Sequence, residues 1–244
     1  MSKFIPYLYN LFNGISAPST LQVEATNDAK PLWPNSIKQM LLPVTEAYRI
    51  QYEQKGATPK GVFWSSTKNV LRRFEILCRI FHCEDLNKGT ASINDLGCGY
   101  GALFDYLEHH PVMINGKYMG YEICKALLDS CNNRINDPRA SFHHSMYATQ
   151  SADYSLVSGT FNMKLNANDD DWLSYTEASL KALWTDSKKG MAFNMLDITD
   201  ARLLNGLYYA DPDSFIKFCR KHLTNNISLI IESDLPDFTI HALR

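Results

Sequence analysis

The stretch Asn94-Asp95-Leu96-Gly97-Cys98-Gly99-Tyr100-Gly101 follows a short apolar run and precedes a helical pattern that begins at Ala102. Glycine has no Cβ, so its backbone can approach a ligand closely, and the first turn of a helix offers unpaired N–H groups. The stretch therefore predicts a turn that binds an anionic or strongly polar group. It also fits a relaxed dinucleotide fingerprint, Gly97-x-Gly99-x-x-Ala102, which keeps a second ligand class open.

The chain around this turn alternates between short apolar strands and helical stretches from about residue 90 onward. Such alternation is typical of a parallel sheet with crossover helices. Two final strands, over 227–231 and 238–243, are separated by turn residues and predict a closing hairpin. We therefore expect an α/β fold with a mostly parallel seven-stranded sheet and an antiparallel strand contributed by the hairpin. The other expected strands are 92–96, 118–122, 140–143, 154–158 and 191–195, and the expected helices are 102–109, 125–132, 172–184 and 212–222.

Two further helices are expected before the sheet. Asn35 or Ser36 can cap a helix that ends at Gly56, and Ser65 or Ser66 can cap a second one with an apolar stripe. Residues 1 to about 30 show neither helical nor strand periodicity and are interpreted as a loop or docking arm. The expected division is an N-terminal arm and helical cap over 1–83, followed by one ligand-binding domain over 84–244.

Composition limits the cellular setting and the class of partner. The 244 residues are 45% hydrophobic with a formal net charge of -2, which excludes a disordered chain and disfavours a nucleic-acid partner. The six cysteines are scattered without a CxxC pair, so they predict free thiols and no metal site. Since no signal peptide or membrane-length apolar run occurs, a soluble cytoplasmic protein is expected.

Two acidic residues at strand ends separate the ligand classes. Asp95, two residues before the first glycine, suits an amine or an ordered water and would crowd a pyrophosphate. Glu122 ends a strand 21 positions after Gly101, and its carboxylate can accept two hydrogen bonds from ribose hydroxyls. A nucleoside is common to both interpretations, whereas the carboxylate at Asp95 favours a ligand that carries positive charge.

With this motif, the strand-end Glu122 and the closing hairpin, roughly residues 66–244 resemble the class I S-adenosylmethionine (SAM)-dependent methyltransferases. The resemblance implies a Rossmann-like fold and SAM as cofactor. It also implies that Asp95 and the glycine turn border the methionine part of SAM, while Glu122 holds the ribose. The implied cofactor-binding set is Asp95, Gly97, Cys98, Gly99, Gly101, Glu122, Ile123, Ser145, Met146, Ser158 and Arg73.

Two members of this set rest on comparison with the family's usual pattern. The family commonly has an acidic residue after its third strand, near the adenine amino group, where this sequence has Ser145 followed by Met146. Adenine recognition is therefore expected to rest on the Met146 backbone and apolar contacts. Arg73 lies on the helix before the glycine turn and is a candidate partner for the SAM carboxylate; alternatively, it is a solvated arginine beside Arg72.

The candidate catalytic residues follow the third and fourth strands. Asn162 can orient an acceptor by hydrogen bonding or can cap the turn in which it lies. His143 and His144 are candidate bases, but adjacent strand residues face opposite ways, so at most one is expected to face the site. Four aromatic residues are candidates for the pocket wall or for a cation-π contact with the sulfonium: Trp64, Tyr100, Tyr208 and Tyr209.

The leading hypothesis is a SAM-dependent methyltransferase that modifies an N or O atom of a small molecule or of a protein side chain. A nucleic-acid acceptor is less favoured because phosphate binding usually needs a concentrated basic surface. Two alternatives remain: a nucleotide-dependent oxidoreductase with a dinucleotide-type turn, and a SAM-binding protein without turnover.

Overall fold

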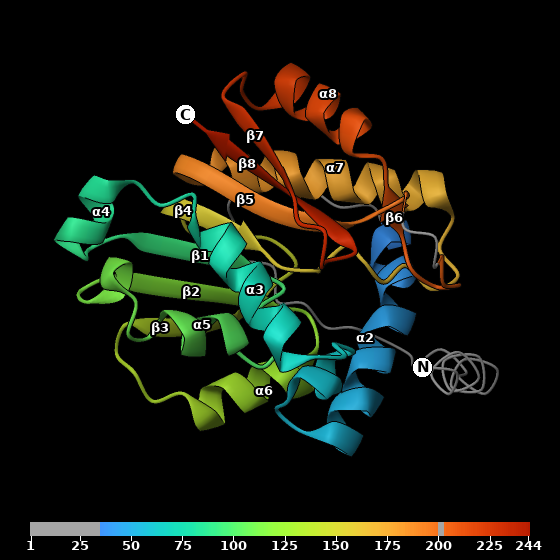
Figure 1. Ribbon diagram of the computed structural model, residues 1–244. Helices are drawn as coiled ribbons and strands as arrows, with labels where there is room; N and C mark the ends of the chain where they lie inside the picture. Colours follow the sequence, from blue (N-terminus) through green and yellow to red (C-terminus); the bar gives the residue numbers. More distant parts are fainter. Residues whose placement is uncertain (1–34, 200–202) are drawn as a thin grey trace.

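A computed structural model describes residues 35–199 and 203–244; the expected arm over 1 to about 30 lies outside the described residues. Its centre is a twisted sheet with helices on both faces (Figure 1). The strands follow the order β3-β2-β1-β4-β5-β8-β7 along the main path of the sheet. They comprise β1 (Ser92–Leu96), β2 (Lys117–Glu122), β3 (Ala140–His144), β4 (Ala152–Val157), β5 (Ser187–Asp197), β7 (Ile227–Ile231) and β8 (Asp237–Leu243).

The sheet confirms the expected architecture and adds one strand to it. Within this path only β8 runs against its neighbours, pairing antiparallel with both β5 and β7, so the chain closes in the expected hairpin. The addition is β6 (Tyr209–Ala210), a two-residue strand that pairs parallel with β5. The periodicity of the sequence missed it because two residues are too few to show alternation.

Helices cover both faces of the sheet and bury two apolar clusters against it. The helices are α2 (Asn35–Lys55), α3 (Thr67–Cys78), α4 (Cys83–Lys88), α5 (Ala102–Leu107), α6 (Lys125–Arg134), α7 (Asp169–Thr185) and α8 (Pro212–His222), with short 3-10 turns η1 (Pro59–Val62) and η2 (Pro111–Met113). On one face, residues of α3 and α5 pack on β1 and β4; on the other, residues of α7 and α8 pack on β5 and β8.

The local chemistry of the caps explains several boundaries. Ser66 accepts a hydrogen bond from the backbone N–H of Asn69 at 3.4 Å and begins α3, as expected. Asp211 accepts from the N–H groups of Asp213 and Ser214, and Pro212 then begins α8. α4 was not expected; its six residues span fewer than two turns, too few for a recognisable apolar face.

The helix α2 (Asn35–Lys55) lies beside the carboxyl ends of the strands and crosses their direction (Figure 1). Its buried residues Leu41, Val44 and Ala47 belong to the core cluster that also contains the strand residues Leu96 and Tyr121. The helix ends at Gly56, which has φ +65° and donates its N–H to the carbonyl of Tyr52. This placement closes one side of the site described below.

Helix α3 packs on the sheet, since its buried residues belong to the same apolar cluster as Ile93 of β1 and Tyr154 of β4. The expected domain boundary between residues 83 and 84 stays a prediction. Throughout 35–199 and 203–244, no helix has both the length and the apolar character needed to cross a lipid bilayer.

Candidate functional site

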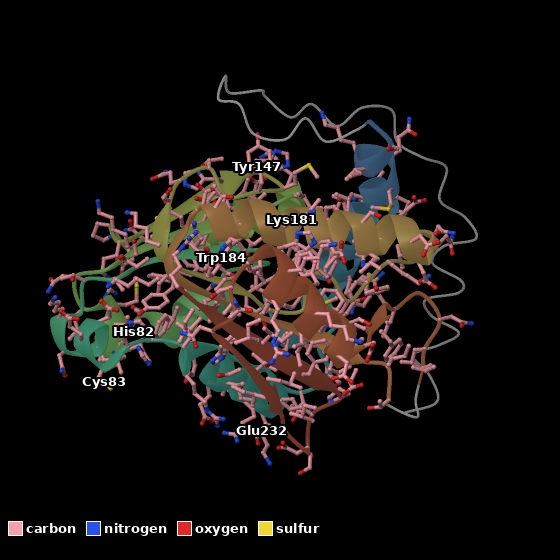
Figure 2. All side chains as sticks on the ribbon, turned by 90° about the horizontal axis from the view of Figure 1, so that it is seen from above. His82, Cys83, Tyr147, Lys181, Trp184 and Glu232 are labelled. Carbon is pink, nitrogen blue, oxygen red and sulfur yellow. The ribbon has the colours of Figure 1, made fainter. Side chains whose placement is uncertain are left out.

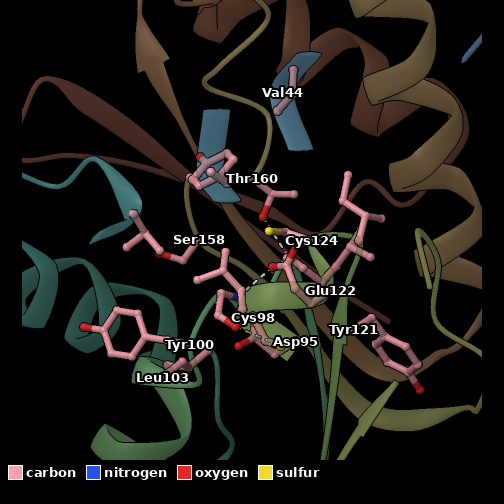
Figure 3. Close-up of a pocket in the computed structure, with 18 of the residues that line it drawn as sticks. Val44, Asp95, Cys98, Tyr100, Leu103, Tyr121, Glu122, Cys124, Ser158 and Thr160 are labelled. Carbon is pink, nitrogen blue, oxygen red and sulfur yellow. Dashed lines mark hydrogen bonds between the residues drawn. The ribbon is translucent and has the colours of Figure 1, made fainter. Parts of the chain in front are cut away.

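A cavity lies where the carboxyl ends of β1, β2 and β4 meet α2 (Figure 3). Parallel strands bring their carboxyl ends to one edge of a sheet, so residues that are distant in sequence become neighbours there. The paired register Asp95 to Gly120 and Leu96 to Tyr121 places the end of β1 directly beside the end of β2. The remaining walls come from α3, α5, α6, α7, the segment that follows η1 and the segment that follows β3.

The glycine turn forms the floor of this cavity, and its first two glycines serve different purposes. Both have left-handed backbones, with φ +77° at Gly97 and +58° at Gly99. A Cβ at Gly97 would come within 2.4 Å of the hydroxyl oxygen of Thr160, so this glycine permits close packing of the loop after β4. A Cβ at Gly99 would meet only Val62, at 3.6 Å, because this position faces the open cavity. Gly99 is therefore where the backbone is most accessible to a ligand.

Glu122 holds this turn in place and keeps acceptor capacity free. Its Oε2 accepts the N–H of Gly99 at 2.9 Å, and its Oε1 accepts the N–H of Cys124 at 2.8 Å. Burial raises the pKa of the carboxyl, while the two backbone N–H groups oppose that shift by stabilising the charge. A carboxylate offers about four lone-pair sites, so these two bonds leave room for a pair of hydroxyl donors.

Asp95 provides the second acid of the cavity. Its side chain is buried and accepts a hydrogen bond from the hydroxyl of Tyr118. Burial raises the pKa of Asp95 to about 7, and the nearby charge of Glu122 acts in the same direction. Near neutral pH the carboxyl is therefore partly protonated, and a cation bound beside it would shift it toward the charged form.

Aromatic side chains from outside the sheet line another part of the cavity. Tyr48 comes from α2, Trp64 from the segment after η1, and Trp172 and Tyr175 from α7. Burial raises the pKa of the Tyr175 hydroxyl to about 12, so this phenol remains protonated at neutral pH. Among the lining residues of the described chain, none is a lysine, arginine or histidine. The cavity thus combines two buried carboxyl groups with an apolar, aromatic enclosure.

The fold is shared with solved methyltransferase structures. Magnesium protoporphyrin IX methyltransferase from Synechocystis PCC 6803 with bound SAM superposes with a TM-score of 0.56 at 11% identity, covering 89% of this chain and 100% of that one. A SAM-dependent methyltransferase of Leishmania major gives a TM-score of 0.56 at 14% identity, covering 84% of this chain and 83% of the other. At these identities the likeness concerns the fold.

A relative in sequence decides the family. The chain is 36% identical over 152 residues to a Mycobacterium tuberculosis protein named "Putative methyltransferase Rv1506c", a match that covers 61% of this chain and 90% of the relative. The chain belongs to the class I SAM-dependent methyltransferases. No protein-family model matches the sequence of this methyltransferase.

The cavity of the methyltransferase brings together nine residues of the expected cofactor-binding set. Gly101 lies outside the lining: it begins α5, and a Cβ there would meet Ile135 at 2.5 Å on the far side of the turn. Arg73 also lies outside the lining. The roles of all these residues in binding SAM stay predictions. Those that line the cavity are Asp95, Gly97, Cys98, Gly99, Glu122, Ile123, Ser145, Met146 and Ser158.

Two of the expected cofactor-binding side chains are engaged with the protein itself. The Ser145 hydroxyl donates to the carbonyl of Tyr147 at 2.7 Å and accepts the N–H of the same residue at 3.2 Å, so it closes a local turn. The Arg73 guanidinium makes a buried, bidentate ion pair with Asp237 at the start of β8. The alternative of a solvated arginine at position 73 is wrong, because its side chain is only 5% exposed.

None of the three candidate catalytic side chains lines the cavity. Asn162 accepts the N–H of Leu196 on β5 at 3.2 Å, so its amide oxygen fixes the loop after β4. His143 stacks on Tyr121 with ring centroids 5.3 Å apart, and burial lowers its pKa. The Nε2 of His144 lies 3.0 Å from the carbonyl oxygen of Ile123. Neighbouring strand residues thus face different ways, and both side chains contact protein groups beside the cavity.

The sequence identified some wall residues and missed others. Trp64 and Tyr100 line the cavity, as expected, whereas Tyr208 and Tyr209 do not. Trp172 and Tyr175 lie three positions apart on α7, so their shared helical face was a signal that could have found them. Tyr48 offered no such signal, because nothing in the periodicity of α2 indicates which surface that helix covers.

Among residues 35–199 and 203–244, the thiols and acids outside the cavity form no metal site. His82 and Cys83 lie at the edge of the molecule, far from α2 (Figure 2), and Cys83 is exposed. Across the part of the chain that the structure describes, no three side chains of histidine, cysteine, aspartate or glutamate gather so that they could hold a metal ion.

Proposed function

We propose that this methyltransferase transfers the methyl group of SAM to a nitrogen or oxygen atom of a small acceptor that carries no negative charge. One observation carries the proposal: Asp95, the open backbone of Gly99 and the carboxylate of Glu122 converge in a single cavity that aromatic side chains enclose. The acids are suited to a cationic nucleoside, and the enclosure is suited to a small apolar molecule beside it.

The residues of the cavity fit SAM part by part. Glu122 has acceptor capacity left for the ribose hydroxyls after it binds two backbone N–H groups. Asp95 would pair with the ammonium group, since a buried carboxyl is stabilised in its charged form by a nearby cation. Ile123 and Met146 would contact the adenine ring, because they provide the apolar lining next to Glu122.

The chain's own contribution to the reaction is to bind, orient and exclude water. When bound, SAM supplies an activated methyl group on its sulfonium, which is the difficult part of the chemistry. The helix α2 and the aromatic wall would enclose the acceptor beside the cofactor, which limits its contact with water and its orientation. The Tyr175 hydroxyl can donate a hydrogen bond to the acceptor but cannot serve as a base at neutral pH, because burial raises its pKa to about 12.

The acceptor class follows from the charges of the wall. The described lining has no lysine or arginine, so the carboxylate of SAM would rely on backbone N–H groups of the glycine turn, and an anionic group on the acceptor would have no cationic side chain to pair with. No histidine of the described chain lines this cavity, and Lys38 and His144 line only a smaller hollow that adjoins it, so the best acceptor is a nitrogen whose lone pair is free at neutral pH. These two points favour a neutral or weakly basic molecule over a nucleic acid or an acidic metabolite.

Titration calorimetry tests the cofactor first. The full chain is expected to bind SAM and S-adenosylhomocysteine (SAH), with NAD as a matched nucleotide control that does not bind. A chain that binds NAD and neither SAM nor SAH would sink the proposal.

A transfer assay with SAM that carries a tritiated methyl group then tests the acceptor. Label is expected in a small-molecule fraction of a cell extract. If label is found only in tRNA or in protein, methyl transfer is supported but the proposal of a small-molecule acceptor is overturned.

A further inference from the structure

A buried ion pair ties α3 to the last strand of the sheet. Nε of Arg73 lies 2.8 Å from Oδ2 of Asp237, and Nη2 of Arg73 lies 2.6 Å from Oδ1. The Arg73 and Asp237 side chains are only 5% and 1% exposed. Burying two charges costs desolvation free energy, and a buried pair is often no more stabilising than apolar residues of the same volume. Stability alone is therefore a weak explanation for this pair.

The same guanidinium also contacts a wall of the cavity. Cζ of Arg73 stands 4.3 Å from the centroid of the Trp64 ring system. A guanidinium is planar, so it can pair edge-on with a carboxylate while its face stacks on an aromatic ring. The ion pair with Asp237 fixes the plane of Arg73, and the stacked contact transmits that orientation to the indole.

Trp64 in turn packs directly on the backbone at the end of β4. A Cβ added to Gly159 would lie 2.4 Å from Cζ2 and 2.9 Å from Cη2 of the indole, so the ring occupies the space that a side chain would need. Trp64 and Gly159 both line the cavity. The position of this indole thus determines the shape of the cavity beside β4.

We propose that Arg73 and Asp237 are positioning residues that hold Trp64 against Gly159 as a rigid wall of the SAM cavity. The effect of this wall on SAM binding rests on the proposed function, whereas the position of Trp64 is a property of the protein without ligand. Arg73 is absent from the lining, so its effect on a ligand passes through the indole. Trp64 acts through its shape, because a cation already stacked on the ring weakens its attraction for a second one.

The experiment follows the indole in the full chain labelled with 5-fluorotryptophan. The chain has four tryptophans, and Trp64→Phe identifies the fluorine resonance of Trp64. The difference in chemical shift between H2O and D2O reports how exposed each ring is. Removing Arg73 alone would leave Asp237 buried and unpaired, which endangers folding. The test variant is therefore R73M/D237L, which replaces both charges by apolar side chains.

The matched control is Arg72→Met. Arg72 neighbours Arg73 on α3 but pairs with Glu75 at 2.6 Å and with Glu232 at 2.9 Å, and Glu232 lies at the surface (Figure 2). We expect R73M/D237L to increase the solvent isotope shift of the Trp64 fluorine at least twofold and to weaken SAM binding at least fivefold. R72M is expected to change neither quantity. Unchanged resonances of Trp172 and Trp184 will show that the fold is intact.

If the solvent isotope shift of Trp64 in R73M/D237L equals that in the wild type, Arg73 and Asp237 do not position the indole. This outcome overturns the positioning role, whatever the SAM affinity of the variant. If the shift increases while the SAM affinity stays unchanged, the significance of the wall for the cofactor is overturned. A wild-type chain that binds no SAM contradicts the proposed function instead, and the isotope shift in the free protein still decides the positioning role.

Discussion

The two walls of the cavity differ in how they are built. The sheet-edge wall consists of Asp95, the glycine turn and Glu122, which all belong to the single strand-helix-strand unit β1, α5 and β2. The helical wall consists of Tyr48, Trp64, Trp172 and Tyr175, which come from three separate parts of the chain. The sheet-edge wall is polar and offers acceptors and backbone, whereas the helical wall offers aromatic surface.

Because of this difference, we expect the sheet-edge wall to determine the affinity for SAM and the helical wall to determine the shape of the space beside it. Hydrogen bonds to charged groups contribute about 1.5–3 kcal/mol each, so changes at the sheet edge should affect SAM binding most. The helical wall contributes enclosure, so its changes should alter which molecules fit beside the cofactor. The following substitutions test that contrast.

The largest effect is expected from Glu122→Gln. A glutamine keeps the size of the side chain but offers one oxygen acceptor, and its amide would face the N–H of Gly99 or of Cys124. SAM affinity measured by calorimetry is expected to fall about a hundredfold or more, corresponding to about 3 kcal/mol. The control is Glu84→Gln, whose carboxylate pairs with Lys88 at the surface. A loss of less than threefold in E122Q would show that the sheet edge does not dominate the affinity.

The second substitution, Asp95→Asn, tests the buried charge through pH. Because the ionised carboxyl binds a cation and its pKa is about 7, wild-type SAM affinity should rise about tenfold from pH 6 to pH 8. The asparagine variant should show a flat profile and a weaker affinity at pH 8. A pH profile with the same rise in D95N would assign the titration to another group.

The stability of the free protein should respond to Asp95 in the opposite sense. Its folded pKa of about 7 lies above the usual value near 4, so the folded state binds more protons between those pH values. The free energy of unfolding therefore falls as pH rises through this window, and D95N removes the fall. Thermal melts at pH 8 should place the unliganded variant a few degrees above the wild type.

The two glycines provide a matched pair for the sheet edge. Gly97→Ala should destabilise the fold, because its Cβ would come within 2.4 Å of Thr160. Gly99→Ala should cost only about 1 kcal/mol of stability for its left-handed backbone, since its Cβ would make only an ordinary van der Waals contact with Val62, at 3.6 Å. That Cβ occupies the cavity, so SAM affinity should fall about tenfold. Equal melting temperatures for the two variants would contradict this division of roles.

The smallest effect is expected at the helical wall, from Trp64→Leu. If the indole acts through its shape, the binding of SAM and of SAH should weaken by about fivefold in each case, because SAH lacks only the sulfonium methyl group with its charge and otherwise has the shape of SAM. Calorimetry with SAM and with SAH measures the loss of affinity for each ligand and so the ratio of the two losses. A loss for SAM at least three times larger than for SAH would instead assign a cation-π contact to Trp64.

The sequence predicted the sheet edge well because its chemistry is local. Strand β1, helix α8 and strand β7 have the expected bounds, and the glycine turn joins β1 to α5 as the motif indicates. Asp95 and Glu122 were identified because each ends an apolar strand, and parallel strands necessarily bring such ends together. The order of polar and apolar residues was sufficient for this part of the site.

Only the tertiary structure decided the partners of Arg73, Asn162 and the two histidines. The sequence placed Arg73 near the cofactor, but its guanidinium is paired with Asp237, 164 positions further along the chain. Asn162 likewise bonds to β5, and His143 stacks on β2. Periodicity identifies the buried face of an element, but a side chain's partner depends on which other element packs there. The sequence alone therefore determined the acids and glycines at the sheet edge of the cavity, and the packing of distant elements determined its aromatic wall.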